Sequence, residues 1–361
     1  MNKTRKRLSE VLFESNRNRV SLKSVLFEAA GDAEKAAAVL SNMPDLSVGP
    51  GAMKRWLNGP GSDPKVRAFL ARGQGDGNKT DEKVSVTATA KELGPLVPTQ
   101  NEIELSKSIG YPLSSIDALK KIVSGGVIVI GPPDNNRIIV SDNIILDGHH
   151  RWSQALAVAG PSARIAAYDI KIPGTPSEKL AFSQVTIAAA TPSGPVKDAK
   201  AGGINILGVS GDEIKGLVLK SVGQPTEAGE ILSRSYIEDL VLDPDLAAKI
   251  GVDADLCDRV VNASDDASMS SAMNDVRDRI ASHVAGNLSQ MNQPAEGSPP
   301  RVDMPQFDKA SYPIPTQIDA LKTGKINYKP KYVAKESTRS TRNEDDLVME
   351  RWLRLAGIVK G

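Results

Sequence analysis

Short apolar runs alternate with helical patterns between residues 84 and 172, and this alternation constrains the fold more than any other feature of the sequence. Alternating apolar positions from Val84 predict one strand, and Ser115 to Val123 has the pattern of a helix that Ser114 or Ser115 caps and Gly125-Gly126 ends. Arg151 to Val158 predicts a second helix. Further strands are predicted at 127–130, 137–140, 143–146 and 164–172. Strands interleaved with helices predict a compact domain of mixed α and β structure.

The pattern after Pro173 becomes helical and acidic, and it predicts helices at about 177–189, 211–221, 227–242, 245–250, 254–262 and 267–290. Gln293 to Pro305 is a Pro-rich linker by composition. Residues 306–346 have little periodicity, which is typical of an extended segment that wraps over a partner. Leu347 to Ile358 predicts a last amphipathic helix.

The first part of the chain contains one pattern twice, because Leu8 to Glu14 is echoed at Leu22 to Glu28. Each copy predicts a short amphipathic helix. These helices either pack on the rest of the protein or dock onto another protein, and the sequence leaves both possibilities open. The Gly- and Asp-rich stretch at 73–81 predicts a linker.

Together these patterns predict an α+β protein in four parts. A basic helical arm and its linker occupy 1–80, and a small mixed α/β domain occupies 81–175. A mainly helical, acidic domain occupies 176–292, and an extended arm that ends in an amphipathic helix occupies 293–361. Because short isolated helices are marginal in water, we expect the terminal arms to bind a partner protein or a second copy of the chain.

Charge is distributed unevenly along the chain, whose formal net charge is +1. The net charge is +6 over residues 1–80, zero over 81–200, −9 over 201–299 and +4 over 300–361. Affinity for DNA depends on Lys and Arg side chains that meet phosphates. The acidic block therefore argues against a specific DNA-binding domain.

Cys257 is the single cysteine, so a disulfide framework is excluded and a reducing compartment is expected. No run approaches the ~18 apolar residues that a membrane span needs. No apolar signal core follows the basic N-terminus. We therefore expect no membrane association and a cytoplasmic location.

Five consecutive residues, Asp147-Gly148-His149-His150-Arg151, lie between a predicted strand and a predicted helix. Backbone N–H groups at the start of a helix have no partner inside the helix and form an anion site together with the helix dipole. Gly148 allows a ligand to approach the backbone, and Arg151 can bind phosphate oxygens with its fork of donors. A histidine here can donate a hydrogen bond or act as acid or base. The sequence therefore predicts a phosphate site, with a structural relic of such a site and a metal site as weaker interpretations.

The stretch Ile144-Ile145-Leu146-Asp147-Gly148-His149-His150-Arg151-Trp152 resembles the signature of the ParB/sulfiredoxin-like superfamily. The resemblance covers Lys83 to Ile172 and extends more weakly to Leu96–Glu102. The turn is similar to that of the free serine kinases of this superfamily. Sulfiredoxin has a catalytic cysteine after the glycine, where this chain has His149, and the Glu-Arg-Arg type of turn found in partition proteins is also absent. The resemblance implies a small α/β domain in which the turn and the following helix hold the phosphates of a nucleotide.

The resemblance further implies phosphoryl transfer from, or hydrolysis of, ATP or another nucleotide with Mg²⁺. His149, His150 and Arg151 would hold the phosphates, and Gly148 would admit them. Asp147 would orient the site or bind the Mg²⁺. In the kinase-like relatives an upstream glutamate is the general base, which points to Glu102 first and to Glu104 second. By these roles Glu102, Asp147 and His149 form the candidate catalytic set.

The alternative function is a non-catalytic structural or assembly protein, such as a component of a virion or capsid. The repeated N-terminal pattern and the Arg354-Leu355-Ala356-Gly357-Ile358 end peptide resemble, loosely, the ends of tailed-phage proteins. Long stretches without a core pattern also suit a partner-bound protein. Under this interpretation the protein resides in the virion or the host cytoplasm. The intact Gly-His-His-Arg turn favours the enzyme, and the arms favour the assembly protein.

Overall fold

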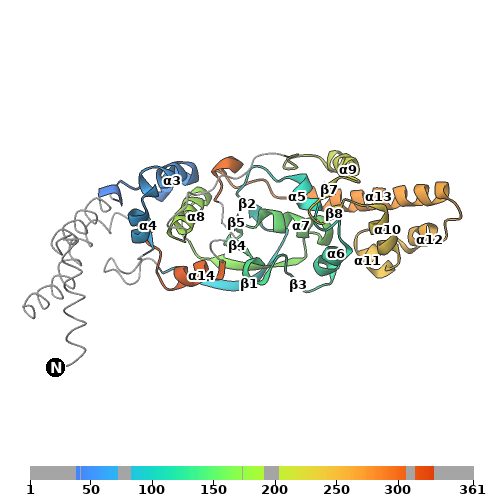
Figure 1. Ribbon diagram of the computed structural model, residues 1–361, viewed down its shortest axis with the longest axis horizontal. Coiled ribbons are helices and arrows are strands. Elements are labelled where there is room, and N and C mark those ends of the chain that lie inside the picture. The colour runs from blue at the N-terminus through green and yellow to red at the C-terminus, as the bar shows by residue number, and fades with distance from the viewer. Residues whose placement is uncertain are drawn as a thin grey trace, which may run out of the picture.

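The computed structural model describes residues 38–40, 42–71, 83–172, 174–190, 203–305 and 314–328. Within these ranges helices surround one central mixed sheet, so the protein combines α and β structure as the sequence predicts (Figure 1). The repeated pattern at 8–28, the linker at 73–81 and the helix predicted at 347–358 lie outside the described residues. No helix in the described part of the chain is both long and apolar enough to cross a membrane.

The central sheet has the strand order β1-β6-β4-β5-β2, and β3 pairs with β6 beside that path. The β1–β6 and β4–β5 pairs are antiparallel, whereas the β2–β5, β3–β6 and β4–β6 pairs are parallel. All of these strands fall between residues 84 and 172, as predicted, although the sequence predicts no strand at the position of β2. Their bounds are β1 Val86–Glu92, β2 Val97–Pro98, β3 Val127–Ile128, β4 Ile138–Ser141, β5 Ile144–Asp147 and β6 Arg164–Ile170.

Both faces of the sheet are buried. Successive residues of a strand point to opposite sides, and here they belong to two different apolar clusters. In β4, Ile138 and Val140 belong to one apolar cluster and Ile139 belongs to another. In β5, Ile145 lies in the first cluster and Leu146 in the second. The sheet is therefore the middle of three layers, and each face holds its own helices in place.

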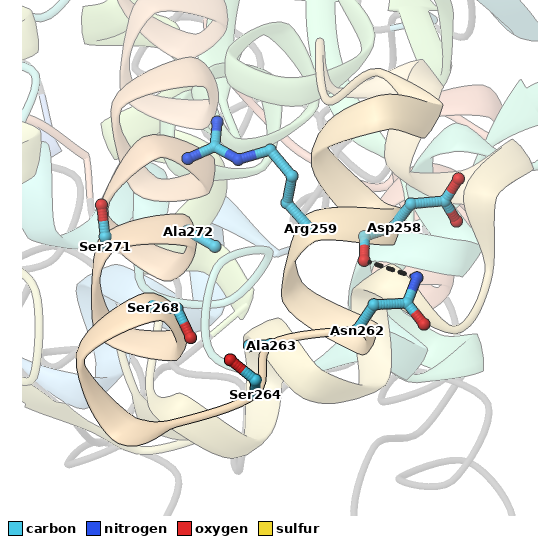
Figure 2. Close-up of a pocket in the computed structure, with 8 residues that line it drawn as sticks. All are labelled: Asp258, Arg259, Asn262, Ala263, Ser264, Ser268, Ser271 and Ala272. Atoms are coloured by element: carbon cyan, nitrogen blue, oxygen red, sulfur yellow. Dashed lines mark hydrogen bonds between the residues drawn. The ribbon is translucent and has the colours of Figure 1, made fainter.

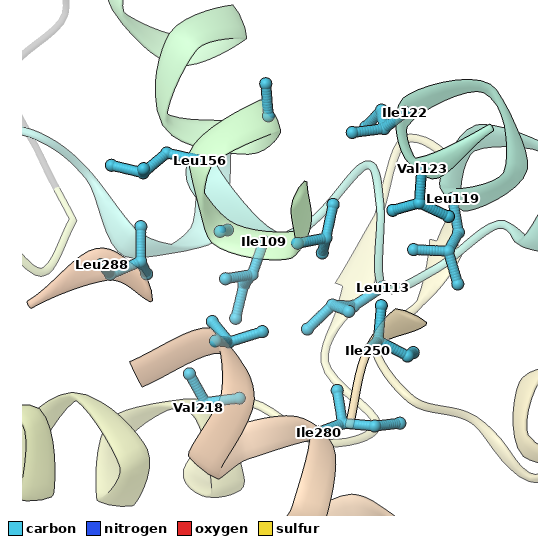
Figure 3. Close-up of a cluster of buried hydrophobic side chains, with 14 of the residues drawn as sticks. Ile109, Leu113, Leu119, Ile122, Val123, Leu156, Val218, Ile250, Ile280 and Leu288 are labelled. Atoms are coloured by element: carbon cyan, nitrogen blue, oxygen red, sulfur yellow. The ribbon is translucent and has the colours of Figure 1, made fainter. Parts of the chain in front are cut away.

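Helices from the centre of the chain cover the first face, and helices from the acidic region pack on those helices and extend the same cluster. Ser115 caps α6, where its side chain accepts a hydrogen bond from the Ala118 N–H, as the sequence predicts. Figure 3 shows Leu119, Leu156 and Ile280 among the side chains that fill this cluster. The helices are α5 Leu105–Ile109, α6 Ile116–Val123, α7 His149–Ala159, α9 Gly211–Lys220, α10 Arg234–Val241, α11 Pro244–Lys249, α12 Ala254–Val261 and α13 Asp266–Leu288.

The second face is covered by one helix from the middle of the chain and by helices from both ends of the described residues. They are α3 Gly49–Asn58, α4 Pro64–Leu70, α8 Pro176–Ala190 and α14 Ile314–Lys322, with short 3₁₀ turns η1 Leu46–Val48 and η2 Pro60–Ser62 beside α3. The helix α8 packs against α3 and α4 (Figure 1). Leu57 of α3 and Leu321 of α14 are fully or almost fully buried in the same cluster as Phe182 of α8. Segments far apart in the sequence thus share one core.

Two predicted elements were wrong in their extent. The helix predicted at 227–242 begins only at Arg234, where the Ser233 side chain caps it, and the residues before it form a hairpin of β7 Pro225–Thr226 and β8 Gly229–Glu230. The stretch predicted to lack periodicity contains α14, whose Ile314, Ile318 and Leu321 share one buried face. In both places tertiary packing decides the structure over a weak local pattern.

The segment 292–305, which contains the linker predicted at 293–305, packs against the rest of the fold. Asn292 Nδ2 donates to the Leu96 carbonyl oxygen at 2.9 Å, and Gln184 Nε2 donates to that of Asp303 at 3.0 Å. A short 3₁₀ turn, η5 Arg301–Asp303, lies near its end. The segment therefore crosses from one helical layer to the other beside the sheet.

We expect that shortening core side chains in either end segment destabilises the whole protein. Leu57→Ala and Leu321→Ala should each lower the free energy of unfolding by about 2–5 kcal/mol, the usual cost of a buried cavity. Urea unfolding followed by tryptophan fluorescence measures this, with the exposed Leu242→Ala as control. Unchanged unfolding in both buried variants would show that the end segments fold independently of the sheet.

Candidate functional site

The joint between β5 and α7 is built around Gly148. This residue has φ +94°, and a Cβ atom there would lie 2.6 Å from Cγ2 of Ile138, so only glycine fits. The first hydrogen bond inside α7 runs from the Trp152 N–H to the Gly148 carbonyl oxygen. No side chain caps the start of α7. The N–H groups of His149, His150 and Arg151 therefore have no acceptor within the helix.

The joint opens into a cavity of about 740 Å³, which we call the joint cavity. All five residues of the predicted turn line it. The other walls come from the loop after β2, from α5, from the loop before β4, from the β7–β8 hairpin and from segment 292–305. Their lining residues are Gln100, Ser106, Lys107, Gly110, Tyr111, Ile130, Gly131, Pro132, Asn135, Leu146, Gln154, Pro225, Thr226, Glu227, Ala228, Arg301, Met304 and Pro305.

His149 is fixed as a neutral, buried acceptor. Its Nε2 accepts a hydrogen bond from the Thr99 N–H at 3.1 Å, so the neutral ring carries its proton on Nδ1. Burial, together with the charges of His150 and Arg301, lowers the pKa of His149 to about 3. This side chain is therefore uncharged near neutral pH, and it can donate a hydrogen bond from Nδ1 but cannot act there as a cation.

Arg151 binds protein oxygens on three sides. Its Nη1 donates to the carbonyl oxygens of Asn135 at 2.9 Å and Arg137 at 2.8 Å, and its Nη2 donates to Oδ2 of Asp147 at 3.1 Å. Three of its five N–H donors are thus engaged within the protein. Arg151 lines the joint cavity as predicted, but its contacts hold the loop before β4 against the start of α7.

Arg301 supplies a cation that the sequence did not predict. Its side chain is only 7% exposed, and its Nη1 donates to Oε2 of Glu104 at 3.2 Å. Its Nη2 lies 3.2 Å from His150 Nε2, which must accept because a guanidinium can only donate. Two of its five donors are engaged by described residues, and the residue lines the joint cavity. Arg301 is therefore better placed than Arg151 to bind an anion.

The two glutamates predicted as general base lie outside the lining of the joint cavity. Glu104 forms ion pairs with Arg301 and, at 3.0 Å, with Lys107. Burial alone would raise the pKa of Glu104, but hydrogen bonds from Ser106 and Lys107 and the charges of Lys107 and Arg301 bring it below its ordinary value. Glu104 is thus held ionised as a partner of two cations. Glu102 contributes its carbonyl oxygen as acceptor for Gln100 Nε2.

Asp147 is the carboxylate that the resemblance assigns to a metal ion. Its Oδ2 accepts from Arg151 at 3.1 Å, and the described residues contain no group of three or more His, Cys, Asp or Glu that could hold a metal ion. Mg²⁺ is usually held by one or two carboxylates together with substrate phosphates. One oxygen of Asp147 is thus already engaged by Arg151.

Side chains behind the joint hold helix α7 at both ends. Trp152 is fully buried, and its Nε1 donates to the Leu93 carbonyl oxygen at 2.9 Å. His283 Nε2 lies 3.0 Å from the Val158 carbonyl oxygen at the end of α7. Helix α7 is thus held at its far end by α13.

A second hollow, of about 530 Å³, lies between α12 and α13 (Figure 2). It is lined by small polar side chains and by Arg259, whose Nη2 is paired with Asp275 at 2.6 Å. Figure 2 shows Asn262 bonded to the backbone of its own helix. No buried charge points to a ligand in this hollow, so we assign the site to the joint cavity.

Sequence reasoning missed the residues that long-range contacts bring to the joint cavity. Arg301 lies 197 positions after Glu104 and stands in a Pro-rich segment that resembles a linker. Asn135 lies in a turn, and Glu227 and Ala228 lie where a helix was predicted. A lone arginine among prolines was the only local signal for this part of the site.

The protein has no match among protein-family models, curated proteins or solved structures.

We expect His149 to make the stability of the protein depend on pH. Because its pKa is lowered from 6.5 to about 3, the fold excludes the protonated form that the unfolded chain adopts. Its contribution is complete above pH 6.5 and is lost as pH falls toward 3, by up to about 1.4 kcal/mol per pH unit. His149→Gln, whose amide oxygen can take the place of Nε2 as an acceptor for Thr99, should flatten this slope in urea unfolding between pH 6.5 and 4.5. Equal slopes in the two proteins would contradict the assignment.

Proposed function

We propose that this protein binds a phosphate-bearing small molecule, of the nucleotide class, in the joint cavity. The observation that carries the proposal is that the uncapped start of α7 and the buried Arg301 line one cavity. Backbone N–H groups at a helix start favour an anion. A guanidinium beside them adds charge-assisted hydrogen bonds of the kind that phosphates receive.

The composition of the joint cavity supports a ligand with a charged end and an uncharged end. Lys107, Arg151 and Arg301 are its cations, and Asp147 and Glu227 are its carboxylates. Tyr111, Ile130, Pro132, Pro225, Met304 and Pro305 provide less polar walls. Its volume lies within the roughly 300–1,000 Å³ usual for small-molecule sites. A nucleotide has both kinds of surface.

The proposal extends to the fold family and to chemistry. We propose that residues 83–172 form a ParB/sulfiredoxin-like domain, which the strand, glycine turn and helix at Gly148 support.

We also propose phosphoryl transfer or hydrolysis as a second activity. A base for it must touch the substrate, and Glu227 is the carboxylate of the joint cavity for which the described residues provide no ion pair or hydrogen bond. Analysis of the products formed from ATP, a nucleotide, by the wild type and by Glu227→Gln tests this second activity.

A charge-reversal pair at Ala228 tests whether the joint cavity binds an anion. Ala228 lines the cavity, and its side chain can be replaced without removing a hydrogen bond. We expect Ala228→Glu to weaken binding of pyrophosphate and ADP by roughly 3- to 10-fold and Ala228→Lys to strengthen it, because like charges repel and opposite charges attract. Calorimetry at low salt measures both. Absence of binding by the wild type at millimolar pyrophosphate and ADP would refute the proposed function.

We expect Arg301, rather than Arg151, to supply the main side-chain contact to the anion. Loss of such a charge-assisted contact costs about 1.5–3 kcal/mol, or roughly 10- to 150-fold in affinity. Arg301→Met alone leaves Glu104 without one of its cations, so Arg301→Met/Glu104→Gln is the decisive variant. The double variant should unfold at nearly the wild-type temperature. It should still bind pyrophosphate more weakly than the wild type, as Arg301→Met does. If the double variant regains affinity, Arg301 serves only to neutralise Glu104.

A further inference from the structure

Gln154, on α7, has a side-chain amide whose orientation the protein fixes. Its Nε2 donates to the Lys107 carbonyl oxygen at 2.8 Å. A carbonyl oxygen can only accept a hydrogen bond, so the amide nitrogen must occupy this position and the amide cannot be turned over. The other branch of the amide is therefore the oxygen, Oε1.

The Oε1 atom of Gln154 is an acceptor that the protein leaves unused. None of the described residues donates a hydrogen bond to it. It is also not one of the buried side-chain atoms that lack a partner, so it reaches the accessible surface of the residue. Water satisfies an accessible acceptor of this kind until a ligand group replaces the water.

The amide of Gln154 stands in a wall of the joint cavity. Gln154 and Lys107 both line the cavity, and the hydrogen bond between them joins α7 to α5 along that wall. His150, four residues before Gln154, also lines the cavity, and side chains four residues apart share one face of a helix. The acceptor thus belongs to a residue about 6 Å further along the axis of α7 than His150, at the helix start.

An acceptor in this place selects a ligand group that can donate. An ionised phosphate offers acceptors alone, so Oε1 does not serve the charged end of the ligand. The donors of a nucleotide are the hydroxyls of its sugar and, in some nucleotides, an amino group of the base. The sugar is bonded directly to the phosphate, whereas the base lies beyond the sugar. About one helical turn from the phosphate site, a sugar hydroxyl is therefore the donor that fits.

We propose that Gln154 recognises the sugar of the bound nucleotide, with Oε1 accepting a hydrogen bond from a sugar hydroxyl. The inference rests on the proposed function and deepens it, because it requires a ligand with a hydroxylated sugar next to its phosphates. The start of α7 and Arg301 hold the phosphates. The carbonyl oxygen of Lys107 positions the amide so that Oε1 is available to the sugar.

Calorimetry with matched ligands measures this contact. The ligands are pyrophosphate, ADP, the 2′,3′-dideoxy form of ADP, which lacks the sugar hydroxyls, and inosine diphosphate, which lacks the amino group of the base. We expect the wild type to bind ADP roughly 3- to 10-fold more tightly than dideoxy-ADP, the range that one hydrogen bond provides.

Three variants separate a contact with the ligand from support of the fold. Gln154→Met removes the acceptor, so the ratio of ADP to dideoxy-ADP affinity should fall close to one while pyrophosphate binds as in the wild type. Gln154→Glu removes the donor to Lys107 but keeps an acceptor, so the ratio should persist although the added charge weakens every ligand. Gln290→Met is the matched control and should behave as the wild type, because Gln290 Nε2 also donates to a backbone carbonyl oxygen, that of Gly286, but the residue does not line the joint cavity.

Equal binding of ADP and dideoxy-ADP by the wild type would overturn the inference. So would a preference that survives in Gln154→Met, a preference that both Gln154 variants lose, or pyrophosphate binding that falls as far as ADP binding in Gln154→Met. If Gln154→Met instead removes a preference for ADP over inosine diphosphate, Oε1 binds the base and the sugar assignment is wrong. A wild type that binds pyrophosphate but not ADP also overturns the inference and leaves the anion site in place, whereas binding of neither refutes the proposed function itself.

Discussion

The guanidinium of Arg151 fixes the geometry on which the joint cavity depends. It binds carbonyl oxygens of Asn135 and Arg137 and the carboxylate of Asp147, so it connects the loop before β4, the end of β5 and the first turn of α7. Hydrogen bonds from a charged donor are among the stronger ones in proteins. Because its side chain is only 13% exposed, water competes poorly for these contacts. The two walls that carry the helix start and Asn135 therefore keep a constant separation.

The three-layer fold places distant segments around this fixed corner. Helix α7 lies on one face of the sheet, held by Trp152 at its start and by contacts with α13 at its end. Segment 292–305 then crosses beside the sheet, and its Arg301 reaches Glu104 and His150. The β7–β8 hairpin adds the remaining wall. No single stretch of sequence contains the site, since each wall depends on packing between layers.

The parts of the site that could be predicted from the sequence are those that local rules determine. The strand, the Gly148 turn and the helix after it follow from an apolar run, a residue able to adopt positive φ and a helical pattern. The Ser115 cap follows from the same kind of local rule. The role of Arg151 could not be predicted, because its acceptors are backbone oxygens of a loop that precedes it. Arg301 was hidden in a segment whose composition resembles a linker, and its partners are almost two hundred residues away.

The electrostatics of the joint cavity limit what charge alone can contribute to binding. Arg301 and Lys107 are both paired with Glu104, Arg151 is paired with Asp147, and His149 is neutral. Cations with partners are oriented but partly neutralised, so their net attraction for an anion is weaker than their number suggests. Directed hydrogen bonds made by uncharged groups must then add to the contact from Arg301. The N–H groups at the start of α7 are one such set.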